Sequence, residues 1–182
     1  MVLTTLQARL TPELVDWFRV DNDGGDAPEL HLVGLTPRDV VRCCAAIQEL
    51  GPRWNARTFH VDDEGIDVTA LERPDFGELV ASGRVTQACV GAEGITVDGT
   101  ELPLVEMFIF VDAIEFFWWP HAGWSPERVT GFFALLMRLL ALAPKATLRP
   151  DPRYAVETRH AFSDSIARVI DDPSRLDLGE RV

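Results

Sequence analysis

The segment from residue 104 to residue 143 constrains the fold most, because two apolar strand candidates are followed closely by an apolar helix. The strand candidates are residues 104–111 (LVEMFIFV) and 114–119 (IEFFWW). The helix candidate covers residues 126–143, where apolar side chains recur with helical spacing and extend round most of the cylinder. A helix that is apolar on most sides lies in a protein core. Its apolar run of 12 residues, broken by Arg138, is shorter than the roughly 20 residues needed to cross a membrane.

Three hydroxyl–proline pairs predict where helices begin: Thr11-Pro12, Thr36-Pro37 and Ser125-Pro126. The hydroxyl oxygen accepts a backbone N–H of the first turn, and proline has no N–H there to leave unpaired. An acidic residue follows in each first turn and suits the positive end of the helix dipole: Glu13, Asp39 and Glu127. We expect a helix from each of these points, the second ending near Leu50, and a last helix over residues 161–171.

Short strand candidates occur along much of the chain, at residues 29–35, 58–62, 84–90, 95–98, 104–111, 114–119 and 146–149. Asp98-Gly99 predicts a tight hairpin, because a type I′ turn needs positive φ at both central residues. Together the elements predict an α+β fold, in which three to five helices pack on an antiparallel sheet, with a mixed sheet as the alternative. We expect one domain over residues 1–172 and a loose tail over residues 173–182.

Two stretches of the chain are similar to each other. Residues 36–53 begin with TPRDV and end with LGPR, and residues 125–145 begin with SPERV and end with LAPK. The two stretches start 89 residues apart, and each lies between two strand candidates. The ordinary explanation is that similarly capped helices look alike, and the alternative is a duplicated strand–helix–strand unit.

Composition excludes several classes of protein. The 182 residues include 17 Lys and Arg against 29 Asp and Glu, which gives a formal net charge of −12 at pH 7. Nucleic acids and anionic membranes need a basic surface, so neither is expected as a partner. The first ten residues lack the basic start and apolar core of a signal peptide, so we expect a cytoplasmic protein. Cys43, Cys44 and Cys89 form neither a disulfide framework nor a paired metal motif.

The negative charge is concentrated in the middle of the chain. Residues 61–115 contain 13 acidic residues and only two basic ones. We expect six of these acids to form an acidic, partner-binding face: Asp62, Asp63, Glu64, Asp67, Asp98 and Glu101. Such a face attracts a basic protein and pairs with its Arg and Lys side chains. The alternative is an acidic surface that only keeps the protein in solution.

Few residues suggest other chemistry. His121 and Trp124 lie after an aromatic strand, where they are candidates for a binding hot spot or a pocket wall, with Glu106 or Glu115 at its rim. His60 lies two residues from Asp62, but no second histidine pair is spaced to complete a metal site. No nucleophile, phosphate or dinucleotide motif is present, so we expect no catalytic residue, metal or cofactor.

In size, acidity, mixed α+β pattern and lack of catalytic motifs, the chain resembles the small bacterial immunity proteins that neutralise toxins. This resemblance covers the composition of the whole chain and carries over no individual residue. It implies a protein-binding inhibitor that occupies the basic site of a cognate toxin domain. The alternative function is that of an enzyme or small-molecule-binding domain with a pocket near His121 and Trp124.

Overall fold

The computed structural model describes residues 3–19, 28–121, 123–151, 156–170 and 173–176. Within these residues it confirms the α+β fold, with six α-helices around a six-stranded antiparallel sheet. The helices are α1 (Leu3–Arg9), α2 (Pro12–Arg19), α3 (Pro37–Glu49), α4 (Phe76–Ala81), α5 (Pro126–Leu142) and α6 (Val156–Ala167). The sequence predicts three to five helices, and the two helices that it does not predict are α1 and the short α4. Helix α4 has no capping hydrogen bond from the side chain of Asp75, the residue before it. None of the helices in these ranges is long and apolar enough to cross a membrane.

The main sheet has the strand order β10-β1-β9-β8-β5-β2, and all its neighbours are antiparallel. Two hairpins, β3–β4 and β6–β7, form separate small sheets. The strands are β1 (Glu29–Val33), β2 (Arg53–Trp54), β3 (Thr58–Val61), β4 (Ile66–Thr69), β5 (Ala88–Glu93), β6 (Thr96–Val97), β7 (Thr100–Glu101), β8 (Val105–Ile109), β9 (Ala113–Phe117) and β10 (Thr147–Pro150).

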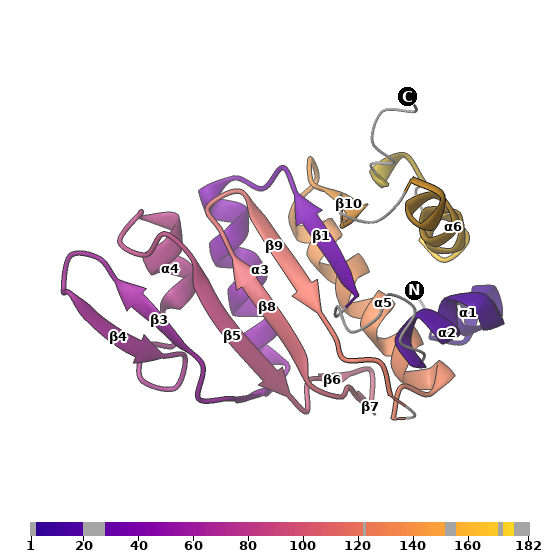
Figure 1. The fold of residues 1–182 in the computed structure, drawn as a ribbon, viewed down its shortest axis with the longest axis horizontal. Helices are drawn as coiled ribbons and strands as arrows, with labels where there is room; N and C mark the ends of the chain where they lie inside the picture. The colour runs from indigo at the N-terminus through magenta and orange to yellow at the C-terminus, as the bar shows by residue number, and fades with distance from the viewer. Residues whose placement is uncertain (1–2, 20–27, 122, 152–155, 171–172, 177–182) are drawn as a thin grey trace.

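Helices α3 and α5 lie side by side against one face of the main sheet, and the other face is turned toward the viewer in Figure 1. The buried side chains of β8 and β9 alternate with partly exposed ones, as expected for a sheet that packs on helices on one side. Phe116 of β9 is fully buried, and its ring centroid lies 6.0 Å from that of Phe132 on α5. The predicted core helix is therefore confirmed.

The helix starts predicted from hydroxyl–proline pairs are all present. The Thr36 hydroxyl accepts the Asp39 backbone N–H at 3.3 Å, and the Asp39 carboxylate accepts the Thr36 backbone N–H at 3.1 Å, which completes a capping box. The Ser125 hydroxyl accepts the Arg128 backbone N–H at 3.4 Å at the start of α5, and Thr11 accepts the backbone N–H of Leu14 at 3.3 Å. These hydrogen bonds satisfy first-turn N–H groups that have no partner within their helix.

The hairpin predicted at Asp98-Gly99 joins β6 to β7. The φ angles of the two residues are 48° and 85°, so both adopt the left-handed conformation that a type I′ turn requires. Glycine adopts this conformation without a steric penalty, and aspartate tolerates it better than most residues.

The two similar stretches both fold as strand–helix–strand units. In one unit α3 connects β1 to β2, and in the other α5 connects β9 to β10. The strands within each unit are parallel, and the two helices cross the same sheet face in opposite directions. The units differ in span, because three strands separate β1 from β2 and a single strand separates β9 from β10. The common origin of the two units stays a prediction.

The predicted loose tail is wrong for residues 173–176. Arg175 donates hydrogen bonds to the backbone carbonyls of Leu140, Ala143 and Ala146, at and just beyond the end of α5. A guanidinium there balances the negative end of the helix dipole and satisfies carbonyls that have no partner within the helix. Leu176 is 7% exposed, so the chain is anchored here. Residues 177–182 of the predicted tail lie outside the described residues.

Candidate functional site

The six acids predicted to form one face belong to two hairpins. Asp62, Asp63, Glu64 and Asp67 lie on β4 and the turn before it, and Asp98 and Glu101 lie on the β6–β7 hairpin. Figure 1 shows β3 and β4 beyond β5 at one end of the molecule, whereas β6 and β7 lie against α5. The structure therefore brings together the first four acids and places the other two elsewhere.

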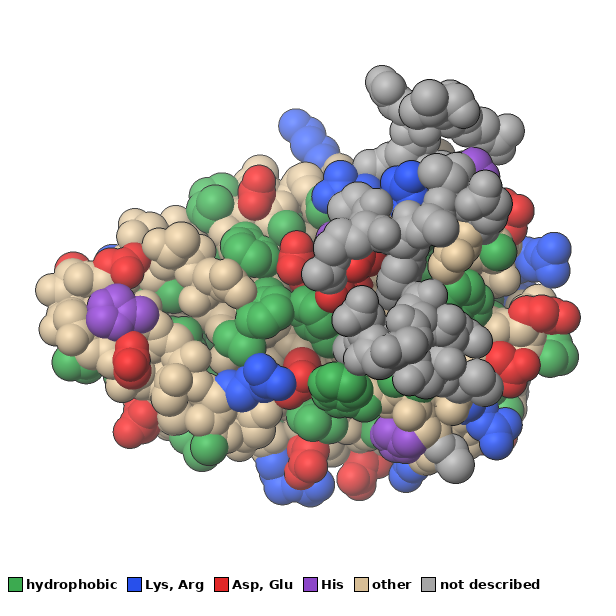
Figure 2. Space-filling view, viewed as in Figure 1, with side chains coloured by type: hydrophobic (Ala, Val, Ile, Leu, Met, Phe, Trp, Pro, Cys, Tyr) green, Lys and Arg blue, Asp and Glu red, His purple; other side chains and the backbone are tan. Residues whose placement is uncertain are grey.

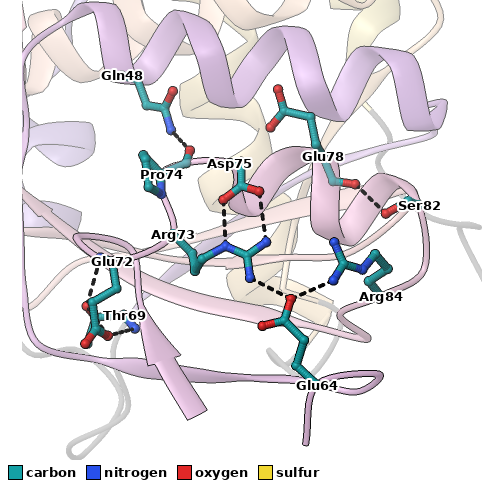
Figure 3. Close-up of polar contacts among 10 residues, drawn as sticks. All are labelled: Gln48, Glu64, Thr69, Glu72, Arg73, Pro74, Asp75, Glu78, Ser82 and Arg84. Carbon is teal, nitrogen blue, oxygen red and sulfur yellow. Dashed lines mark hydrogen bonds and ion pairs between the residues drawn. The ribbon is translucent and has the colours of Figure 1, made fainter. Parts of the chain in front are cut away.

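Two arginines neutralise part of the charge near the β3–β4 turn (Figure 3). Arg73 lies 3.0 Å from both Asp75 and Glu64, measured between nitrogen and oxygen atoms. Arg84 lies 2.6 Å from Glu64 and 2.8 Å from Asp63. Arg73 and Arg84 are the two basic residues among residues 61–115. Both already contact carboxylates of the β3–β4 turn, and Arg73 also contacts Asp75 at the start of α4.

The arginine contacts predict a loss of stability in acid. The hydrogen bond from Arg84 lowers the pKa of Asp63 below its ordinary value of 3.8, and the one from Arg73 lowers that of Asp75. A lowered folded-state pKa stabilises the protein above the unfolded value, and this contribution disappears as the pH falls through the folded value. Between pH 4 and pH 2 the urea midpoint should therefore fall less in Asp75→Asn than in the parent. An equal fall in both proteins would contradict a stabilising role for the Asp75 contact.

The remaining acids of the hairpin have no arginine or lysine partner among the described contacts. Asp62 accepts a hydrogen bond from the Thr86 hydroxyl at 3.1 Å. Asp67 lies 2.8 Å from Nδ1 of His60, the residue opposite it on β3, and both side chains are more than half exposed. Glu72 accepts hydrogen bonds from the backbone N–H and the hydroxyl of Thr69. These acids give the hairpin its excess negative charge.

Exposed apolar side chains accompany these acids. Among the described residues, four large hydrophobic side chains are exposed: Ile66, Leu71, Val111 and Trp119. Ile66 begins β4 and is 46% exposed, and Leu71 follows the end of β4 and is 66% exposed. We call Asp62, Ile66, Asp67, Leu71 and Glu72 the hairpin surface, which includes both faces of β4, because Ile66 and Asp67 are consecutive on that strand. Because β4 pairs with β3 alone in the described part of the chain, its other edge is open as well.

A second cluster lies on the main sheet, on the face opposite the helices. Because Phe116 points to α5, its neighbour Glu115 points to the other face. The register places His31 of β1 opposite Glu115 of β9, with Glu29 two residues away on the same face of β1. The His31 Nε2 atom lies 3.1 Å from a Glu29 oxygen, and Nδ1 lies 3.7 Å from a Glu115 oxygen. Glu29 and His31 are 6% and 5% exposed.

The other glutamate expected at a pocket rim is bound by an arginine. Arg57 contacts Glu106 with Nη2 at 2.5 Å and Nε at 2.6 Å, and its Nη1 lies 3.7 Å from the Cys89 sulfur. Burial raises the pKa of the Cys89 thiol, which makes it a poor nucleophile. Phe108 and Phe117 lie on this face with ring centroids 4.8 Å apart, and Figure 2 shows hydrophobic side chains gathered over the middle of the same face.

The structure corrects the expectation for Trp124. Its side chain is fully buried, with its ring centroid 5.0 Å from that of Phe18, so a partner cannot contact it directly. His121 is exposed, and its Nδ1 accepts the backbone N–H of Gly123 at 2.9 Å. A cavity of about 400 Å³ lies instead between α1, α2 and the start of α5, lined by Thr11, Val15 and Pro126 among others.

Comparisons of the chain with protein-family models, curated proteins and solved structures gave no match. The function is therefore inferred from the hairpin surface and from the cluster of Glu29, His31 and Glu115.

Proposed function

We propose that the protein is an inhibitor that binds a basic protein partner through the hairpin surface, as a toxin-immunity protein would. The observation that carries the proposal is that Ile66 and Leu71 are exposed on the same hairpin and its following loop as Asp62, Asp67 and Glu72, acids with no described Arg or Lys contact. Apolar side chains that contact a partner supply binding energy, and surrounding charges select the partner and speed encounter. The hairpin surface combines both kinds of residue on one protruding element (Figure 1).

Charge identifies the chemistry of the partner. The chain has a net charge of −12, and the two arginines nearest the hairpin surface are held by Asp63, Glu64 and Asp75. An acidic partner would be repelled, whereas Arg and Lys side chains of a basic partner can pair with the exposed carboxylates. A basic toxin domain has this chemistry. The resemblance to immunity proteins in size and acidity supports the same class of partner.

The proposal is tested with the protein encoded beside this gene, because toxin and immunity genes would be neighbours. Expression of that protein alone should arrest growth, and co-expression of this chain should restore it. Purified samples should bind each other, and association should slow as salt shortens the Debye length below about 10 Å. A neighbouring protein that neither binds this chain nor arrests growth contradicts the immunity assignment.

Reversal of two charges tests which surface is used. The variant Asp62→Lys/Asp67→Lys should slow association with this partner about tenfold, because it replaces attraction by repulsion at the encounter surface. The matched control is Asp98→Lys/Glu101→Lys, which makes the same charge change on the β6–β7 hairpin. Stopped-flow association rates and melting temperatures are measured for both variants. Equal slowing in the two variants would assign the effect to net charge and would exclude a dedicated hairpin surface.

A further inference from the structure

We propose that Glu29, His31 and Glu115 form a binding site for one divalent transition-metal ion, with Zn²⁺ as the ion that fits them best. The site is separate from the hairpin surface, since it lies on the main sheet between β1 and β9, on the face opposite α3 and α5. One imidazole and two carboxylates are ligands that zinc accepts in proteins. Within the described residues, theirs is the group of three metal-ligating side chains whose donor atoms converge.

Sheet geometry explains why these three residues meet. Glu29 and His31 are two positions apart on β1, so both project from the same face of the sheet. Glu115 lies directly opposite His31 on β9 and projects from that face too. One donor atom from each residue lies within 4.8 Å of the other two. Backbone pairing therefore holds the three ligands in place without a loop.

Binding of a single ion requires a movement of Glu115, because the two glutamates approach different ring nitrogens of His31: Glu29 lies 3.1 Å from Nε2, and Glu115 lies 3.7 Å from Nδ1. A tetrahedral ion with bonds of about 2.1 Å holds its ligand atoms about 3.4 Å apart. Nε2 of His31 and the nearer oxygen of Glu29 are 3.1 Å apart, close to that separation. Glu115 must move toward them, and its side chain is 26% exposed, which leaves room for rotation. Three protein ligands leave the fourth position of a zinc ion to water.

Charge and burial favour a cation at this position. The side chains of Glu29 and His31 are less than 10% exposed, and two carboxylates face one imidazole. Burying like charges together costs free energy, and a divalent cation between them offsets this cost.

Arg149, a neighbouring residue, provides a test in which the metal affinity should rise and not fall. Arg149 of β10 lies opposite His31 in the register and so projects from the same sheet face, and its Nε is buried without a hydrogen-bond partner. Its positive charge repels a cation bound to His31. Removal of that charge should therefore tighten metal binding, whereas removal of a ligand should weaken it.

The experiment titrates Zn²⁺ into the full chain by calorimetry, with Co²⁺ absorption as a second readout. We expect one Zn²⁺ per chain, Co²⁺ bands typical of nitrogen and oxygen ligands, and a higher melting temperature with zinc. Glu115→Gln should weaken binding by at least the 10–100-fold that loss of an outer-shell partner costs. Arg149→Gln should tighten it. His60→Gln is the matched control, because His60 also contacts a carboxylate, at 2.8 Å, but on the β3–β4 hairpin.

The results separate a built site from surface binding. Weaker binding in Glu115→Gln, tighter binding in Arg149→Gln and no change in His60→Gln support the proposal. Equal affinities in the parent and Glu115→Gln, or a loss confined to His60→Gln, overturn it. If Glu115→Gln does not fold, Arg149→Gln decides, since a buried structural cluster without a metal site predicts no increase in affinity.

Discussion

Replacement of Phe132 by alanine is expected to lower the free energy of unfolding by about 3–5 kcal/mol. Phe132 is fully buried on α5, and its ring lies against several others. The ring centroids of Trp118, Phe18 and Trp124 are 5.4, 5.5 and 6.0 Å away. Alanine loses the transfer free energy of the ring and leaves a cavity that large, rigid neighbours fill only in part. Urea unfolding followed by circular dichroism measures the loss.

Trp119→Ala is the matched control for Phe132→Ala. Trp119 follows β9 as Trp118 does, but its side chain is 51% exposed. Its removal should cost less than about 1 kcal/mol, because surface substitutions away from packed groups have small effects. Domains of this kind are stabilised by about 5–15 kcal/mol in total, so the loss in Phe132→Ala is a large part of it. An equal loss of unfolding free energy in the two variants would contradict the placement of Phe132 of α5 in the core.

The second large effect is expected on partner binding. The double variant Ile66→Ser/Leu71→Ser should weaken binding to the protein encoded beside this gene by about 30-fold or more, or about 2 kcal/mol. Both side chains are exposed in the free protein, so their loss should leave the melting temperature nearly unchanged. Dissociation should speed up more than association slows, since apolar contacts form after encounter. Surface plasmon resonance separates the two rates.

Val111→Ser provides the control for this double variant. Val111 is 45% exposed, close to Ile66 at 46%, but it lies in the turn between β8 and β9. The control should bind the partner with the affinity of the parent. A loss of affinity in Val111→Ser as large as that in the double variant would assign the interface to the β8–β9 turn instead.

The parts of the fold that depend on local interactions are predictable from the sequence. Thr36 and Asp39 lie three residues apart, and the two hydrogen bonds of the capping box follow from that spacing. The turn at Asp98-Gly99 likewise depends on two adjacent residues. By contrast, β2 has only two residues and forms because it pairs with the longer strand β5. Such short strands leave no alternation to detect.

The candidate sites are less predictable, because they depend on strand register. Glu29 and His31 form an alternating pair on one strand, but their proximity to Glu115 requires the pairing of β1 with β9. A shift of that register by one residue would turn Glu115 to the opposite face. Similarly, the number of acids between residues 61 and 115 indicates an acidic region. It does not show that Arg73 and Arg84 bind three of these acids, Asp63, Glu64 and Asp75.

The position of β1 has a consequence for how the chain folds during synthesis. β1 ends at residue 33, but its two neighbours in the sheet are β9 and β10, which begin at residues 113 and 147. At about 5–20 residues per second, roughly 4–17 s pass between synthesis of β1 and completion of β9. During this time both edges of an apolar strand lack their partners and can pair with other chains. Pairing over such long sequence separations also makes folding slow. We therefore expect refolding yield to fall as protein concentration rises, even under conditions in which the folded protein is stable.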